Sequence, residues 1–260
     1  MSDIALRPRS ATELVDAAFQ LYRRDPLPLI TGLAIIYVPW LLFVAIGGYT
    51  SLLTAQADPT AFDVRSYVFA MGSELVAYLL AATLMTVLAS DLYLGRPVDL
   101  VASIRGVIPR LGAVLVAAVI VAVCGMIGFI FLVVPGVYVV LRLFAVKQVV
   151  LLEGKSGVAA VDRSWHLVKG QVWHVFVTML LAVLLNLALT FGAGMLAFLI
   201  PSMIARLVLS TAVKVVVYPL ICIIETVLYY DIRIRREGFD IEYLAAIAPQ
   251  SPFPEQPAST

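Results

Sequence analysis

The sequence predicts an all-α integral membrane protein, with six transmembrane helices and three amphipathic helices at the cytoplasmic membrane surface. Of its 260 residues, 62% are hydrophobic and only 13% are charged, whereas soluble domains carry about 25% charged residues. Six apolar runs alternate with short polar segments, and the basic residues gather on every second one of these segments. A chain with so few charges must face something other than water over most of its surface, and lipid accounts for all three observations.

Five of the apolar runs are long enough to cross a bilayer core of roughly 30 Å, which takes about 20 helical residues. A sixth, shorter run follows Pro135-Gly136, a dipeptide that is typical of a tight turn. We therefore expect a hairpin of two spans at this position. The six predicted spans cover residues 27–52, 67–90, 111–134, 137–152, 172–200 and 207–230.

The basic residues predict that both termini are cytoplasmic, because cytoplasmic loops retain Lys and Arg. With this orientation the inner segments hold thirteen of the eighteen basic residues, and the outer loops hold only Arg65 and Arg206. The remaining three lie within spans. We expect a multi-pass protein of a prokaryotic plasma membrane.

Segment 158–172 predicts an amphipathic helix that is followed directly by a span. Its valines and Trp165 recur at spacings of three and four residues, and Arg163 lies among the polar residues on the opposite side. A charged helix of this kind lies in the membrane interface rather than across the core. Gly170 stands where the chain must turn from the surface helix into the span.

The same plan recurs at residues 10–24, where Ser10 or Thr12 could cap the helix, and at residues 97–110. Each surface helix precedes an outward span and a returning span, so the membrane domain, residues 1–245, divides into three units. A Pro-rich tail at 246–260 is expected to be disordered. The three units cover roughly residues 1–90, 91–152 and 153–231.

Five ionisable residues lie inside the predicted spans, where each costs at least ~2.5–3.5 kcal/mol unless it is paired or hydrated. They are Glu74, Arg142 and Lys214 toward the outer side, and Lys147 and Glu225 toward the inner side. We expect Glu74 to pair with Arg142 or Lys214, and Glu225 to pair with Lys147. Such residues serve either structure, with lysines reaching to headgroups, or a polar conduit through the bundle.

A second group of candidate residues lies at the cytoplasmic surface. Its aromatic members fit the belt that Trp and Tyr form at a membrane interface. Its charged members are either topology anchors with internal ion pairs, or a site for anionic lipid headgroups or a protein partner. The group comprises Arg163, Trp165, Trp173, Asp231, Arg233, Arg235 and Arg236.

No catalytic or metal-binding motif accompanies these residues in the sequence. The two histidines, His166 and His174, are eight residues apart without an HExxH motif, and GKS at 154–156 lacks the glycine that a phosphate loop needs at position 149. Cys124 and Cys222 lie in apolar runs, as inert cysteines do. We expect no enzyme, metal or cofactor. The expected partners are the lipid bilayer, including anionic lipids, and a protein partner or second copy of the chain, without nucleic acid.

Four motifs resemble the family named after the glycerophosphoryl diester phosphodiesterase membrane domain. They are RSW at 163–165 with Trp173 downstream, VPGVY at 134–138, LEGK at 152–155 and YYDIRIRREGFD at 229–240. The resemblance covers most of residues 1–245 and implies a multi-span helical membrane protein. It does not imply a phosphodiesterase, because no second domain follows residue 245 in this sequence.

Three classes of function compete, of which an intramembrane enzyme is the least favoured because no catalytic motif is present. The first is a non-catalytic scaffold or accessory module acting on the cell envelope, and it is the one we expect. The alternative is a transporter or lipid-handling protein, which needs a cavity within the membrane lined by groups such as Glu74, Arg142, Lys214 or Glu225. A scaffold can be packed solid, so the presence of such a cavity distinguishes the two.

Overall fold

The computed structural model describes residues 7–47 and 64–247, and every regular element in these two stretches is a helix. Six of the helical segments are long and apolar enough to cross a membrane, as the sequence predicts. The all-α membrane fold is therefore confirmed. The six segments are Pro26–Val44, Met71–Tyr93, Leu100–Phe131, Val133–Glu153, Val172–Ala197 and Ala205–Glu237.

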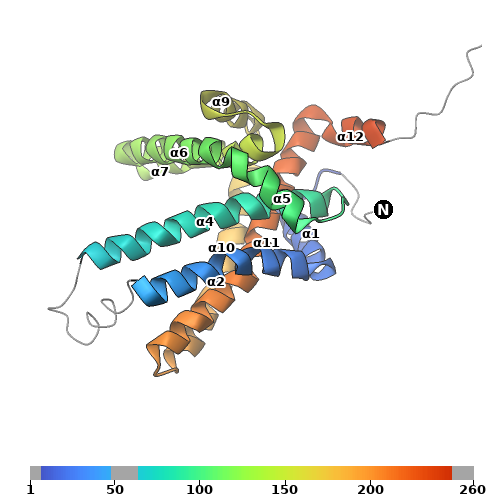
Figure 1. The fold of residues 1–260 in the computed structure, drawn as a ribbon. Helices are drawn as coiled ribbons and strands as arrows, with labels where there is room; N and C mark the ends of the chain where they lie inside the picture. The colour runs from blue at the N-terminus through green and yellow to red at the C-terminus, as the bar shows by residue number, and fades with distance from the viewer. Residues whose placement is uncertain (1–6, 48–63, 248–260) are drawn as a thin grey trace, which may run out of the picture.

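Four long helices form the main bundle: α2 (Pro26–Gly47), α4 (Val64–Tyr93), α10 (Val172–Phe198) and α11 (Met203–Glu237). Helix α11 packs against each of the other three, and its buried residues include Ile223, Val227 and Leu228. In Figure 1 these helices converge at one end of the molecule and diverge toward the other.

A separate hairpin is formed by α6 (Leu111–Phe131) and α7 (Val133–Arg142), and its ribbon diverges from α4 (Figure 1). The tip of this hairpin, where α6 meets α7, is strongly apolar and exposed, with Ile130 75% and Val134 80% accessible. Water-soluble proteins rarely expose contiguous apolar surface of this kind. The protein is therefore a multi-pass membrane protein.

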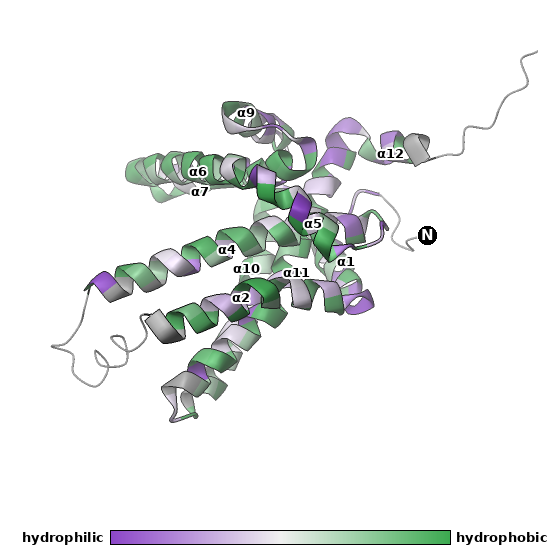
Figure 2. Ribbon diagram, viewed as in Figure 1, coloured by the Kyte–Doolittle hydropathy of each residue, from purple (hydrophilic) through white to green (hydrophobic). Residues whose placement is uncertain are grey.

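The short helices gather at the end where the main bundle converges, which we call the polar end. They are α1 (Ala11–Arg24), α5 (Leu100–Val107), α9 (Gly157–Leu167) and α12 (Phe239–Ile247). Figure 2 shows that hydrophilic residues concentrate at this end, while the long helices are mainly hydrophobic.

The sequence explains where the three expected surface helices begin and end. Helix α1 starts with a capping box, in which Glu13 N–H donates to Ser10 Oγ at 3.4 Å and Ser10 N–H donates to Glu13 Oε2 at 2.7 Å. Asp99 caps α5, and the 3₁₀ turn η2 (Ile108–Arg110) joins α5 to α6. After α9, Gly170 has a φ of +82°, a value that favours glycine, so the predicted turn is confirmed.

The predicted turn at Pro135-Gly136 is wrong by three residues. The chain reverses at Leu132, which has an extended φ of −176°, and α7 has already begun at Val133. Pro135 occupies the first turn of α7, where its missing N–H costs nothing. Gly136 instead permits close packing, because a Cβ at this position would lie only 2.5 Å from the Phe129 ring, and a Cβ on Gly128 only 2.9 Å from Gly136 Cα.

The returning span is not one continuous helix. Helix α7 ends at Arg142, and after a short turn the chain continues as α8 (Val146–Gln148) and the π-helix η3 (Val149–Glu153). The left-handed Gly154, with a φ of +72°, ends this segment. The interruption changes the position of Arg142, as described below.

Helix α11 is longer than the predicted span 207–230. Its 35 residues end at Glu237, and the cap residue Gly238 follows, whose N–H donates to Ile234 O and whose φ is +65°. At 1.5 Å per residue the helix measures about 52 Å, well beyond the roughly 30 Å bilayer core. The following α12 begins at Phe239 and takes in the first two residues of the predicted tail, while residues 248–260 lie outside the described residues.

Candidate functional site

The last turns of α11 present polar side chains on two different faces. Tyr229, Arg233 and Glu237 are four residues apart and so share one face of the helix, whereas Asp231 and Arg235 share another. The first face meets η3 and α9, and the second meets α10 and the segment that precedes α1. The cluster predicted from the sequence is therefore two separate sets of contacts.

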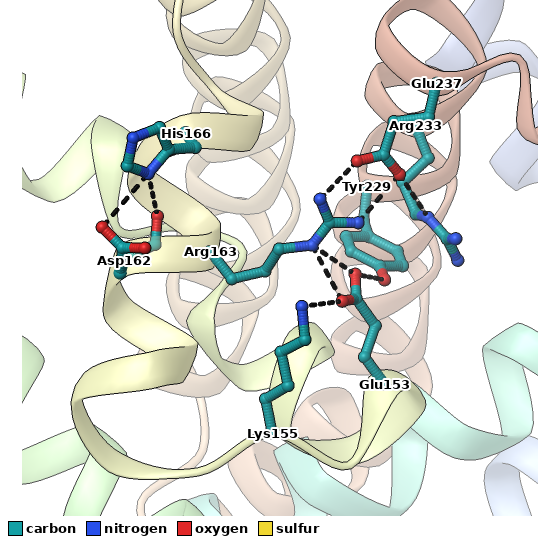
Figure 3. Close-up of polar contacts among 8 residues, drawn as sticks. All are labelled: Glu153, Lys155, Asp162, Arg163, His166, Tyr229, Arg233 and Glu237. Atoms are coloured by element: carbon teal, nitrogen blue, oxygen red, sulfur yellow. Dashed lines mark hydrogen bonds and ion pairs between the residues drawn. The ribbon is translucent and has the colours of Figure 1, made fainter.

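On the first face, Arg163 of α9 lies between two carboxylates (Figure 3). Its Nε donates to Glu153 Oε2 at 2.8 Å, and its Nη2 donates to Glu237 Oε2 at 2.8 Å. Tyr229 OH donates to the other Glu153 oxygen at 2.8 Å, and Arg233 Nε donates to Glu237 at 3.2 Å. We call these five residues the Arg163 network. The two carboxylates raise the pKa of the Arg163 guanidinium above its ordinary value, Glu237 contributing most.

On the second face, the Asp231 carboxylate is 1% exposed and accepts three hydrogen bonds. The donors are the Arg9 N–H at 2.7 Å, Arg235 Nε at 2.7 Å and His174 Nε2 at 2.9 Å. Arg235 also donates through Nη2 to the Arg9 carbonyl at 2.6 Å. These four residues, the Asp231 junction, tie the start of the chain to α10 and α11.

Sequence reasoning missed the acids that organise the Arg163 network. Glu237 is four residues after Arg233, a helical spacing that could have indicated the pair, but nothing in the sequence brings Glu153 to Arg163. Three of the predicted surface residues lie outside both sets of contacts, and one of them, Trp165, lies against Arg142. Trp173 is 74% exposed and packs on Phe176 with ring centroids 5.3 Å apart, and Arg236 is exposed on the surface of α11.

The expected position of Arg142, near Glu74 toward the outer side, is wrong. The Arg142 guanidinium lies over the Trp165 ring, 4.3 Å from its centroid, and the Arg142 carbonyl accepts a hydrogen bond from Ser164 at 2.9 Å. Both partners belong to α9. The cause is the end of α7 at Arg142, which lets the chain turn against α9 instead of continuing as a regular span.

Both predicted intramembrane ion pairs are present. Lys147 Nζ of α8 lies 2.7 Å from Glu225 Oε2 of α11, and Lys214 of α11 pairs with Glu74 of α4. The first pair is the more enclosed, with side chains 23% and 19% exposed against 38% and 45% in the second. Lys214 is the partner of Glu74, and Arg142 is not.

The Lys147–Glu225 pair lines a cavity of about 340 Å³, which we call the core cavity. It lies between α4 and the α6–α7 hairpin, with walls from α8, α10 and α11. Apart from the ion pair, Tyr78 and Thr83, its lining is apolar. The main apolar lining residues are Leu79, Val114, Ala117, Ala118, Val121, Val140 and Met179.

A second cavity of about 230 Å³, the side groove, adjoins the core cavity between α4 and α6. The two share Leu79, Thr83 and Val114 in their linings. A larger recess of about 570 Å³ between α2 and α4 has no charged residue among its described lining residues. The more enclosed of the two ion pairs, Lys147–Glu225, thus lies in the wall of the core cavity beside the α6–α7 hairpin.

The described residues contain no group of three His, Cys, Asp or Glu side chains that could hold a metal ion. Comparison of the chain with models of protein families, with curated proteins and with solved structures finds no match.

Proposed function

We propose that this protein handles lipid in the plasma membrane, binding a lipid chain beside the α6–α7 hairpin without catalysing a reaction. The observation that carries the proposal is the core cavity with the Lys147–Glu225 pair in its wall. We prefer lipid handling to a scaffold, because a lipid-handling protein needs a cavity of this kind, whereas a scaffold can be packed solid.

The size and lining of the cavity support ligand binding. Ligand pockets are typically about 300–1,000 Å³, mainly apolar, with a few polar groups that fix orientation, and the core cavity has about 340 Å³ with this kind of lining. Protein interiors are otherwise close-packed, with few voids larger than a water molecule. An apolar ligand that fills the core cavity would explain why the helices leave a space of this size between them.

The proposed orientation places the polar end and both termini in the cytoplasm. It rests on the basic residues of the inner segments, since cytoplasmic loops retain Lys and Arg. In a variant without Cys124 and Cys222, a cysteine in place of Pro135 should react with an impermeant reagent added outside intact cells. A cysteine in place of Lys155 should react only after the membrane is opened, and the reverse pattern would invert the orientation.

A scaffold or accessory module is the second candidate. It is favoured by α12, which follows the last span at the polar end and exposes Ile241 at 72% and Leu244 at 54%. Apolar side chains in this position could contact a partner protein. The resemblance to the glycerophosphoryl diester phosphodiesterase membrane domain family is compatible with either candidate.

Crosslinking with a lipid that carries a photoreactive group on its acyl chain tests the proposal. The protein is reconstituted in nanodiscs, and crosslinked peptides are identified by mass spectrometry. We expect crosslinks to cavity residues such as Leu79 and Val140. Ala118→Trp, which fills the cavity, should remove them, while Ala122→Trp on the exposed face of α6 should not. Crosslinks confined to exposed faces, or unchanged in Ala118→Trp, would refute the proposal.

A further inference from the structure

A polar pocket of about 420 Å³ lies at the polar end, where α4 ends and α6 begins. Helix α5, the turn η2 and the π-helix η3 complete its walls. Its charged lining residues are Asp91, Arg96, Asp99 and Arg110, and Ser90 and Ser103 add hydroxyl groups. The pocket thus lies beside the end of the candidate span Met71–Tyr93, and lipid headgroups meet membrane spans at their ends.

The polar pocket and the side groove follow one another along one face of α4. Val76, Leu80 and Thr83 line the groove, and Val87 and Ser90 line the pocket, at helical spacings of three and four residues. On the facing side, Arg110 of the pocket directly precedes Leu111 and Gly112 of the groove.

The length of this track fits a lipid of one leaflet. Tyr78 in the core cavity and Ser90 in the polar pocket are twelve residues apart on α4, which corresponds to about 18 Å at 1.5 Å per residue. Half of the bilayer core measures about 15 Å. A lipid with its headgroup in the polar pocket would therefore reach the core cavity with its acyl chain.

The charges of the polar pocket balance. Arg96 pairs with Asp91 at 3.3 Å, while Asp99 accepts hydrogen bonds from the Val101 and Ala102 N–H groups. Arg110 donates to the Leu151 carbonyl. Two arginines and two aspartates give no net charge, so a headgroup with one charge of each sign is matched better than an anionic headgroup.

The side chains of the polar pocket also indicate which kind of zwitterionic headgroup fits. Arginine presents a planar fork that suits phosphate, and carboxylates accept hydrogen bonds from a primary ammonium group. A quaternary ammonium group is instead recognised by a cage of aromatic rings. Tyr230 is the one aromatic side chain among the described lining residues, and its hydroxyl is within 2.7 Å of Ser90 Oγ.

Two glycines leave open space along the track. A Cβ on Gly106, which lines the polar pocket, or on Gly112, which lines the side groove, would meet no atom within 4 Å. Neither glycine has a positive φ, so the backbone does not require glycine at these positions. The space can therefore be filled by substitution without displacing the protein.

We propose that the polar pocket binds the headgroup of a glycerophospholipid with a primary ammonium group, with the arginines facing the phosphate and Asp91 and Asp99 facing the ammonium. The acyl chain of this lipid lies in the side groove and extends to the core cavity. The inference rests on the proposed lipid-handling function and names the class of lipid.

Native mass spectrometry of the full chain tests the headgroup. The protein is released from nanodiscs that contain equal amounts of phosphatidylethanolamine, phosphatidylcholine and phosphatidylglycerol with the same acyl chains. We expect phosphatidylethanolamine to be retained about tenfold over the others, as one charge-assisted hydrogen bond would give. Equal retention, or preference for another lipid, would overturn the headgroup assignment.

Gly106→Leu, which fills the polar pocket, should abolish the preference, and Val101→Leu on an exposed position of the same helix should preserve it. A preference that persists in a folded Gly106→Leu protein would overturn the site. Asp91→Asn is an independent variant, because it makes the pocket net positive. It should shift retention from phosphatidylethanolamine toward phosphatidylglycerol, and an unchanged ratio would count against the proposed ammonium contact.

The two proposals fail in different ways. If the wild-type protein gives no acyl-chain crosslinks to the core cavity, lipid handling itself is refuted. Crosslinks at the cavity together with no headgroup preference would leave lipid handling in place and refute only the headgroup site.

Discussion

The polar end and the cavity side of the bundle use charged residues in opposite ways. At the polar end, Asp231 and Arg163 each bond to several partners from different helices, and these contacts hold the ends of the helices together. On the cavity side, Lys147 and Glu225 face a space of about 340 Å³ with apolar walls.

This difference shows how the α6–α7 hairpin is held. Arg142, at the end of the hairpin, stacks on Trp165 of α9, and α9 is fixed to α11 through Arg163. The hairpin is thus positioned from its base at the polar end, while its sides leave room beside α4. A rigid polar base with a loosely packed apolar side is an arrangement that can admit a lipid without disturbing the helix ends.

The largest expected effect comes from breaking the Asp231 junction. Asp231→Ala removes the buried carboxylate that accepts hydrogen bonds from the Arg9 N–H, Arg235 Nε and His174 Nε2, and leaves Arg235 only its bond to the Arg9 carbonyl. Removing one partner of a buried pair costs about 3–5 kcal/mol, and thermal unfolding in detergent measures the loss. The control variant is Asp162→Ala, which removes a surface contact with His166, since the Asp162 side chain is 69% exposed. It should cost well under about 1 kcal/mol. Equal losses in the two variants would mean that the junction does not hold the polar end together.

The Lys147–Glu225 pair should show a smaller effect that can be reversed. Lys147→Glu or Glu225→Lys places like charges within a few ångströms of each other in the core cavity. Because both side chains remain about one-fifth exposed, we expect a loss of about 1–3 kcal/mol for each single variant. The double reversal restores opposite charges and should recover most of it. A double variant no more stable than the singles would contradict the direct pairing.

A third comparison concerns two glycines of α6. Gly128→Ala directs a methyl group to within 2.9 Å of Gly136 Cα, so the hairpin must separate at a cost of about 1–3 kcal/mol. Gly112→Ala meets no atom within 4 Å and should instead stabilise by about 0.5–1 kcal/mol through helix propensity. Unfolding of both variants, with crosslinking to the core cavity, would show whether hairpin packing and cavity access are separate properties. Similar stability of the two variants would remove the argument for close contact at the tip.

Much of the fold could be predicted from the sequence, because the bilayer imposes simple rules. Span length, the alternation of polar segments and the helical spacing of apolar residues are local properties, and they located all six spans and the helices α1, α5 and α9. The ion pairs of Lys147 and Lys214 followed from the high cost of isolated charge in lipid.

The rest depends on where helices end and how they meet. A continuous apolar run gives no sign that α7 stops at Arg142, so the depth of this residue was wrong. Glu153 reaches Arg163 only because the π-helix η3 ends at Gly154 beside α9. The core cavity is an absence of packing between helices that are distant in sequence, and no local pattern indicates it.

The smallest expected effect lies at the exposed edge of the polar end, in the capping box of α1. Hydrogen bonds from the Ser10 N–H and from Arg7 lower the pKa of Glu13 to about 2, from an ordinary value of 4.5. Because the folded protein binds this proton less readily than the unfolded chain, the contribution of Glu13 is present above pH 4.5. It is lost as the pH falls toward 2. The protection of amides in the first turn of α1, measured against the exchange rate of an unfolded chain at the same pH, should therefore fall across this interval in the wild type. Glu13→Gln should show the lower protection already at neutral pH and little further change, whereas the Asp231 junction sets the protection of the later turns in both proteins. If acid leaves the first turn unchanged in the wild type, the cap does not depend on the Glu13 charge, and the stability of the polar end comes from its buried contacts alone.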